Sequence, residues 1–184
     1  MADSALTKQR LADALKELMQ TRSLARISVG DITAHCGINR QTFYYHFKDK
    51  YDLVGWIYST ETLPFMGSFS DRAHWTDGLR DLCLYVQQNK KFYVNALNTP
   101  GQNSFEEYLT QFLQSLISSL IETESGGRIA REDRAFIADF YAFAFVGLVM
   151  KWARGGMKED PAYYVGRIRE LINGSLLREL EKYK

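Results

Sequence analysis

Cysteine and proline are both scarce in this chain, and each scarcity excludes a class of structure. The two cysteines, Cys36 and Cys83, lie far apart and form no CxxC pair. A disulfide framework is therefore excluded, and we expect two buried, reduced thiols. Prolines occur only at positions 64, 100 and 161, so long stretches of the chain are free to form helices.

Long apolar runs are also missing. The longest, Phe140 to Met150, is about half the length needed to span a bilayer and is bounded by Asp139 and Lys151. The first ten residues, MADSALTKQR, contain no apolar segment of the kind found in signal peptides. We therefore expect a soluble, cytoplasmic protein with no membrane partner.

Neither sign of charge dominates, since the formal net charge of the chain is +1. Residues 1–52 carry eight Lys and Arg against six Asp and Glu, and residues 53–184 carry fifteen against sixteen. A nucleic-acid surface on this protein would thus be a local patch on one face.

Motifs for catalysis and cofactor binding are absent as well. His35, His46 and His74 show no metal-ligand spacing with one another or with the cysteines. The sequence contains no GxSxG, P-loop or GxGxxG motif, and paired carboxylates such as Glu106–Glu107 fall on polar helix faces. We expect no metal, no cofactor and no enzyme activity. The alternative is that the chain is an all-helical enzyme.

Helical periodicity is present along the whole chain, whereas strand-like alternation is hard to find. Leu11, Leu15, Leu18 and Met19, for example, recur on one helical face. The pattern predicts an all-α fold of about nine helices, at residues 5–21, 28–36, 40–48, 51–63, 76–88, 91–97, 105–121, 132–154 and 161–181. We expect Pro64 to end or kink its helix, and Asp160 followed by Pro161 to start the last one.

The segment from Ser28 to Lys50 has the spacing of a helix-turn-helix. Ser28 with Asp31 three residues later resembles a capping box, which predicts a helix start. Gly37 is placed for the positive φ of a helix C-cap, and Asn39 offers an N-cap to a new helix beginning at Arg40. In a helix-turn-helix this second helix reads base edges in the major groove.

Helical phase divides the second helix of this motif into two faces. Phe43 and Phe47 are four residues apart and are expected to face the core, whereas Tyr44 and Tyr45 turn outward. Arg40 suits guanine and Gln41 suits adenine. Including the start of the preceding helix, we predict that the DNA contacts come from Ser28, Val29, Asn39, Arg40, Gln41, Thr42, Tyr44, Tyr45, His46, Lys48 and Lys50. The alternative is that these residues are ordinary core and solvated surface.

The stretch ISVGDITAHCGINRQTFYYHFKDKYDLV, preceded by LADALKELM, resembles the DNA-binding domain of the TetR family of bacterial transcription regulators over about residues 5–58. The match includes Ile32, Gly37, Ile38, Thr42, Phe43, Tyr44, His46, Phe47, Lys48 and Leu53. Gly30 departs from it, because many members place there a side chain that reaches DNA. The resemblance implies a DNA-binding domain over residues 1–50, a helical regulatory and dimerisation domain over residues 51–184, and a homodimer on a palindromic double-stranded operator.

The helix expected at residues 132–154 is apolar on nearly every side between Phe136 and Met150, so it has to be buried on every side. One flank would pack in its own subunit and the other in a partner, as the resemblance implies for the last two helices. We predict dimer contacts from Phe136, Phe140, Phe143, Gly147, Met150, Val165, Ile168 and Ile172. The alternative is a central core helix in a monomer.

The stretch FYAFAFVGLVMKWARGGMKEDPAYYVGRI resembles a TetR subgroup that includes regulators of dihydroxyacetone-kinase operons. That resemblance implies control through the C-terminal domain, either by a small-molecule effector or by a kinase-like protein co-regulator. An effector pocket would be lined by aromatic residues, for which the candidates are Phe92, Tyr93, Tyr108, Phe112 and Tyr141. The same residues are equally compatible with ordinary core, and repression and activation both stay open.

Overall fold

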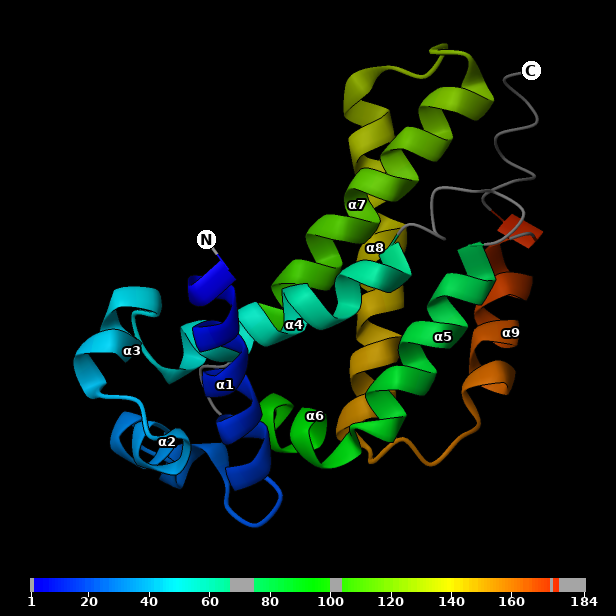
Figure 1. Ribbon diagram of the computed structural model, residues 1–184. Coiled ribbons are helices and arrows are strands. Elements are labelled where there is room, and N and C mark those ends of the chain that lie inside the picture. Colours follow the sequence, from blue (N-terminus) through cyan, green and yellow to red (C-terminus); the bar gives the residue numbers. More distant parts are fainter. Residues whose placement is uncertain (1, 67–74, 100–103, 173, 176–184) are drawn as a thin grey trace. The chain divides into compact units, whose positions relative to one another are not determined.

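The computed structural model describes residues 2–66, 75–99, 104–172 and 174–175, and its ordered elements in this part of the chain are helices (Figure 1). They are α1 (Ala2–Leu18), the 3₁₀ turn η1 (Leu24–Arg26), α2 (Val29–Cys36), α3 (Arg40–His46), α4 (Lys50–Met66), α5 (Trp75–Gln88), α6 (Lys90–Leu97), α7 (Ser104–Ser125), α8 (Arg131–Arg154) and α9 (Pro161–Ile172). The predicted all-α class is confirmed.

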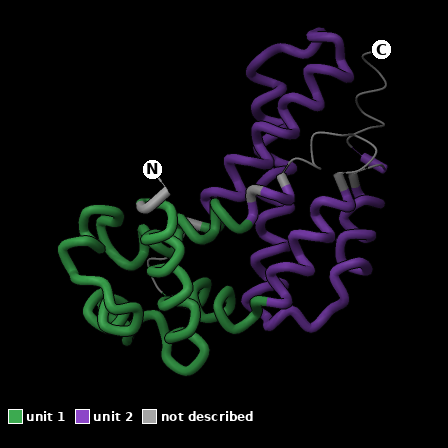
Figure 2. Tube along the Cα trace, in the orientation of Figure 1, with its two compact units in different colours: residues 1–61, 89–105 green, residues 62–88, 106–184 purple. Residues whose placement is uncertain are grey.

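The chain forms two compact units (Figure 2). Unit 1 comprises residues 1–61 and 89–105, and unit 2 comprises residues 62–88 and 106–184. The two compact units do not show which residues bind DNA, so the predicted end of the DNA-binding domain at residue 50 stays a prediction. Unit 1 does show that α6 folds with the N-terminal helices, although it follows α5 in the chain.

The core of unit 1 forms where α2 packs on α1 and α3 packs on α2. Leu11 and Leu15 from α1 meet Ile32 from α2 and Phe43 from α3 in this core, and all four are fully buried. An isolated helix as short as α2 or α3 is not stable in water. Burial of these apolar side chains, worth about 1.5–3 kcal/mol each, therefore stabilises both helices in place.

A second cluster of unit 1 is aromatic and joins α4, α6 and the start of α7. The Tyr58 ring stacks on Tyr93 at 5.5 Å between centroids and lies 4.9 Å from Phe105. Phe92 also packs edge-on against Tyr58, at 5.9 Å. Burial raises the pKa of Tyr58 well above its ordinary value, so its hydroxyl stays neutral.

Asn95 of α6 connects this cluster to the end of α1. Its amide nitrogen donates to the carbonyls of Met19, at 3.2 Å, and Arg22, at 2.7 Å. Its oxygen accepts the backbone N–H of Leu24 at 2.9 Å. One side chain thereby satisfies three backbone groups where the chain leaves α1 and enters η1.

Unit 2 is built from α5, α7, α8 and α9, with α5 packed on α9. Polar contacts tie the end of α8 to its neighbours, because the Tyr164 hydroxyl donates to the Leu148 carbonyl at 2.6 Å and Trp152 Nε1 donates to the Glu159 carbonyl at 3.1 Å. The buried apolar side chains of these helices include Leu79, Leu82, Cys83, Val86, Leu109, Leu113, Ile117, Ile121, Ala138, Ala142, Val146, Val149, Val165 and Ile168.

Several helix boundaries differ from those expected from the sequence. The expectation that Pro64 ends or kinks its helix was wrong in part, because α4 continues to Met66. Only two helical residues follow Pro64, so its missing N–H removes one hydrogen bond near a helix end. The predicted last helix is confirmed to Ile172, and its expected continuation to residue 181 lies outside the described residues, apart from 174–175.

Replacing Asn95 by alanine is expected to destabilise the protein by about 1–3 kcal/mol, because it leaves partly buried backbone groups of the α1–η1 junction without their side-chain partner. Asn98→Ala, at an exposed position at the end of the same helix, is the matched control and should change stability by no more than about 0.5 kcal/mol. Urea denaturation of the two variants measures both values. Equal effects of the two substitutions would contradict the role given to Asn95.

Candidate nucleic-acid interface

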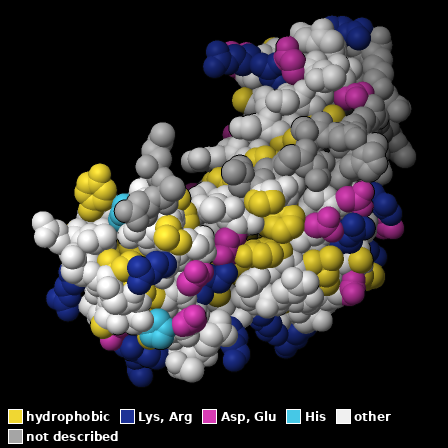
Figure 3. Space-filling model, viewed as in Figure 1, with side chains coloured by type: hydrophobic (Ala, Val, Ile, Leu, Met, Phe, Trp, Pro, Cys, Tyr) yellow, Lys and Arg dark blue, Asp and Glu magenta, His cyan; other side chains and the backbone are white. Residues whose placement is uncertain are grey.

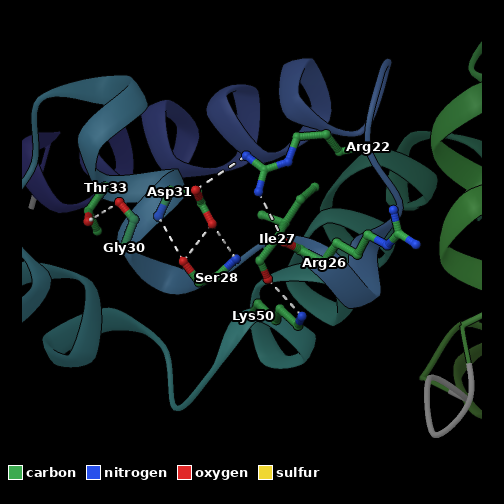
Figure 4. Close-up of polar contacts among 8 residues, drawn as sticks. All are labelled: Arg22, Arg26, Ile27, Ser28, Gly30, Asp31, Thr33 and Lys50. Carbon is green, nitrogen blue, oxygen red and sulfur yellow. Dashed lines mark hydrogen bonds and ion pairs between the residues drawn. The ribbon is translucent and has the colours of Figure 1, made fainter.

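The helix-turn-helix begins with a capping box at Ser28, as predicted. The Ser28 hydroxyl accepts the Asp31 N–H at 3.1 Å, and Asp31 Oδ2 accepts both the Ser28 N–H, at 2.8 Å, and the Ser28 hydroxyl, at 2.6 Å. Figure 4 shows the Asp31 carboxylate between Ser28 and Arg22, whose Nη1 lies 3.3 Å from Asp31 Oδ1. The hydrogen bonds from Ser28 and then from Arg22 hold the pKa of Asp31 well below its ordinary value.

Two features fix the turn between α2 and α3. Gly37 adopts a left-handed conformation with φ of 67°, which confirms its predicted role as a C-cap. The Asn39 side chain accepts the Thr42 N–H at 2.7 Å and so caps α3, also as predicted. Arg10 of α1 donates to the Cys36 carbonyl at 2.6 Å, which satisfies the last turn of α2.

Helical phase divides α3 as the sequence predicted. Phe43 and Phe47 are 0% and 3% exposed, and the Phe47 ring packs edge-on against Trp56 of α4. Tyr44 and Tyr45 are instead 58% and 82% exposed. Two neighbouring exposed tyrosines present both an apolar ring and a hydroxyl donor, which suits contact with a molecule outside the chain.

The exposed face of α3 offers hydrogen-bonding groups that the protein itself does not use. Within the described part of the chain, no hydrogen bond or ion pair joins another residue to the side-chain polar groups of Arg40, Gln41, Thr42, Tyr44, Tyr45, His46 or Lys48. The His46 ring packs edge-on against Tyr45 at 4.9 Å. These donors are therefore available to base edges and phosphate oxygens.

Three of the predicted contact residues, Ser28, Asn39 and Lys50, make hydrogen bonds within the protein, and a fourth, Val29, is partly covered. Ser28 and Asn39 cap helices through their side chains, and Val29 is half-buried. Lys50 was expected to point outward, but its Nζ donates to the carbonyls of Leu24, Ala25 and Ile27 at 2.7, 3.2 and 2.7 Å. Burial lowers the pKa of Lys50 from its ordinary value. The orientation expected for Lys50 was wrong, because its ammonium group donates to three carbonyls in and just after η1.

Charge on this unit is local, as the composition suggested. Figure 3 shows basic side chains spread over the visible face of unit 1, with acidic ones between them, and no single large basic area. The exposed Arg40, at the start of α3, and the exposed Lys48, just after its end, supply positive charge to this part of the unit. Arg10 and Arg22 donate instead to groups of their own unit, Arg10 to the Cys36 carbonyl and Arg22 to the Asp31 carboxylate. The sequence did not reveal these contacts, because the partners are 26 and 9 residues away.

The residues predicted to form a dimer face divide into exposed and buried groups. Phe136, Phe140 and Phe143 are 73%, 62% and 61% exposed, and Gly147, on the same stripe of α8, has no atom within 4 Å of an added Cβ. By contrast Met150, Val165 and Ile168 are buried within unit 2 and contribute to its core. The side chain of Ile172 lies outside the described residues. On α9, Tyr163 and Leu171 are exposed instead, and they were not among the predicted contact residues.

By length and composition α8 could cross a membrane, and it is the one helix among the described residues with that property. Its first turn carries Glu132 and Asp133, and its last turn carries Lys151 and Arg154. One face of the helix is buried against its own unit, through residues such as Ala142 and Val149. A helix with one buried and one exposed apolar face fits a contact with another protein surface.

The aromatic residues predicted to line an effector pocket are divided between the two units. Phe92 and Tyr93 are buried in the aromatic cluster of unit 1. Tyr108, Phe112 and Tyr141 belong to unit 2 and are half-buried, with the Tyr141 hydroxyl 2.9 Å from Ser175 Oγ. The pocket therefore stays a prediction. As for metals, the described residues contain no group of three or more His, Cys, Asp or Glu side chains placed to hold an ion.

The α2–turn–α3 geometry and the free polar face of α3 together define a helix-turn-helix DNA-binding protein. Residues 11–55 match the family described as bacterial regulatory proteins, tetR family, and residues 73–174 match the family described as transcriptional regulator C-terminal region. The chain belongs to the TetR family of bacterial transcription regulators, as the sequence resemblance predicted.

Relatives of known function and structure extend this result. Over 151 residues, which are 80% of this chain and 80% of the relative, the sequence is 28% identical to the HTH-type dhaKLM operon transcriptional activator DhaS of Lactococcus lactis. The solved structure of a dihydroxyacetone kinase operon activator DhaS aligns with a TM-score of 0.71 at 22% identity, covering 98% of this chain and 99% of that one. Thermus thermophilus FadR, a TetR-family repressor solved with lauroyl-CoA, aligns with a TM-score of 0.66 at 15% identity, covering 90% and 92%.

The capping carboxylate of α2 makes a pH-dependent contribution to stability. Because the folded pKa of Asp31 is lowered from 3.8, its contribution is present above that value and is lost as the pH falls toward the folded pKa. We expect Asp31→Asn to be less stable than the wild type at pH 7 and the difference to shrink below about pH 4. Urea denaturation at pH 7, 4 and 2.5 measures this difference.

The control for this series is Asp13→Asn, which removes an exposed carboxylate that accepts a hydrogen bond from Gln9 on its own helix. Its effect at pH 7 should be smaller than that of Asp31→Asn. A stability difference for Asp31→Asn that stays constant down to pH 2.5 would contradict the assignment.

Proposed function

We propose that this regulator acts as a homodimer on a palindromic operator, with α3 of each subunit in a major groove and the C-terminal unit controlling the assembly. The observation that supports it most strongly is the exposed, uncommitted set of Arg40, Gln41, Tyr44 and Tyr45 on a helix anchored by Phe43 and Phe47. Their side-chain polar groups have no hydrogen-bond or ion-pair partner within the described residues, so they are free to bind base edges while their helix is held rigidly.

The parts of the interface have different roles. Arg40 at the N-terminal end of α3 is placed to pair with a guanine, and Gln41 with an adenine. Tyr44, Tyr45, His46 and Lys48 supply donors for phosphate oxygens, which give salt-dependent affinity without sequence preference. Ser28 and Asn39 are part of the same surface, where their backbone and remaining side-chain groups contribute positioning contacts.

Dimerisation follows from the stripe Phe136, Phe140, Phe143 and Gly147 on α8, with Tyr163 and Leu171 on α9. These side chains leave apolar surface in contact with water, and pairing with a second copy across a two-fold axis removes it. Gly147 lets the partner helix approach closely, because it adds no side chain at the C-terminal end of the stripe. A two-fold dimer presents two copies of α3, which requires an operator with two related half-sites.

Two modes of control remain as candidates. A small-molecule effector bound in the C-terminal unit would change the separation or tilt of the two reading helices. The alternative is a kinase-like protein co-regulator, which the similarity to an activator of a dihydroxyacetone kinase operon favours. Copurification of such a kinase with the regulator would favour the second mode, and a ligand-dependent change in operator affinity of the purified protein would favour the first. The proposed compartment is the cytoplasm, where its DNA and both free thiols would be found.

Arg40→Ala should weaken binding to an operator by roughly 5- to 150-fold per half-site, because it removes a guanine contact worth about 1–3 kcal/mol. Tyr44→Ala should also weaken binding, with less effect on sequence preference. The measurement is fluorescence anisotropy with an operator selected from random duplex DNA, at two salt concentrations. Lys158→Ala, in an exposed loop after α8, is the matched loss of one positive charge. Unchanged affinity and preference in both α3 variants would overturn the assignment of α3 as the reading helix.

Phe140→Arg should convert the dimer into a monomer, because it places a charge in the centre of each buried α8 stripe and removes a contact worth about 1.5–3 kcal/mol per subunit. Sedimentation equilibrium measures the mass in solution. Leu6→Arg, at an apolar position of α1 that is 61% exposed, is the control and should leave the dimer intact. A wild-type protein that sediments as a monomer would refute the proposed dimer.

A further inference from the structure

Gly30, the second residue of α2, lies directly against the side chain of Arg40. An ideal Cβ added to Gly30 would be 2.2 Å from Arg40 Nη2, 3.0 Å from its Cζ and 3.2 Å from its Nε. Ordinary contacts of such an atom begin at 3.4 Å. The Arg40 guanidinium therefore occupies the space that any side chain at position 30 would need.

The backbone gives no reason for a glycine at this position. Gly30 lies within an α-helix and is not among the described residues with positive φ, whereas Gly37 is. Its carbonyl accepts the Thr33 hydroxyl at 3.2 Å, a contact visible in Figure 4 that any residue would allow. Since glycine weakens a helix relative to other residues, a different requirement has to account for it. The position of Arg40 supplies that requirement.

Arg40 is the first residue of α3 and belongs to the end of the helix that reads bases. Within the described residues its guanidinium has no hydrogen-bond or ion-pair partner that would fix its direction. The guanidinium lies instead against the bare surface of α2 at Gly30. A side chain at position 30 would displace the guanidinium by about 1 Å or more, the difference between 2.2 and 3.4 Å.

We propose that Gly30 determines sequence specificity through Arg40: the missing side chain lets Arg40 lie along α2 in the direction that pairs it with one guanine of each operator half-site. Gly30 is a positioning residue in this account, since it need not touch DNA itself. The inference rests on the proposed function of α3 as the reading helix. It also explains why a residue with no side chain stands at the start of α2.

The test is selection from random double-stranded DNA with the full-length protein and its variants, followed by sequencing of the bound pool. Wild type should select a guanine at one position of each half-site, and Arg40→Ala should lose that preference. Gly30→Ala should reduce the preference at the same position by roughly tenfold and leave the other positions unchanged. The displaced group is the flexible end of a side chain, so thermal stability should not fall.

Two comparisons distinguish positioning from a general effect on folding. Gly30→Ala should have no further effect on selection in the Arg40→Ala background, because its influence passes through that residue. Gly166→Ala adds the same methyl group to α9, where nothing lies within 4 Å, and should leave base preferences unchanged.

Each possible negative result contradicts a different step of the proposal. If Gly30→Ala keeps the guanine preference that Arg40→Ala loses, or acts equally in both backgrounds, the role of Gly30 is refuted while α3 remains the reading helix. If Arg40→Ala changes no preference, the inference is overturned at Arg40. If the wild-type protein enriches no sequence at all, the proposed operator recognition fails and the inference fails with it.

Discussion

The burial of Phe43 and Phe47 is the constraint on which the rest of the DNA-binding surface depends. A helix of seven residues is too short to persist alone, so α3 exists because these two rings are packed among α1, α2 and α4. Their spacing also fixes the rotation of α3 about its axis. Once that rotation is set, Arg40, Gln41, Tyr44 and Tyr45 have to face outward, and the same packing that stabilises the unit aims its polar side chains.

A series of backbone contacts holds the segments around α3. Ser28 and Asp31 start α2, Gly37 and Asn39 define the turn, and Lys50 donates to the carbonyls of Leu24 in η1 and of Ile27 just after it. Each contact removes an unsatisfied group at the end of a short helix, where such groups are most frequent. Because the backbone is held rigidly, the side chains that read DNA are the part that is free to adjust to it. Gly30 acts in the same way on Arg40, since its missing side chain leaves room for the guanidinium.

The two halves of the protein differ in what they leave exposed. Unit 1 exposes polar donors and tyrosine rings on α3, a combination suited to DNA. Unit 2 exposes phenylalanine rings on α8, which suit an apolar protein surface. The similarity to a dihydroxyacetone kinase operon activator and to a lauroyl-CoA-bound repressor shows that this fold occurs both in a regulator that activates and in one that represses. One fold thus serves both signs of regulation.

The sequence by itself determined the all-α class, the helix-turn-helix, and the inward and outward faces of α3. It also determined the caps at Ser28, Gly37 and Asn39. These features depend on residues within a few positions of one another, where periodicity and capping rules apply directly. Only the tertiary structure decided the features that join distant residues. Lys50 turns toward η1, Asn95 binds the end of α1, and Arg40 lies over Gly30. Packing within unit 2 buries Met150 and Val165 and leaves Tyr163 and Leu171 exposed. Such contacts bring together groups separated by about ten to more than seventy residues, and a linear pattern carries no record of which distant surfaces meet.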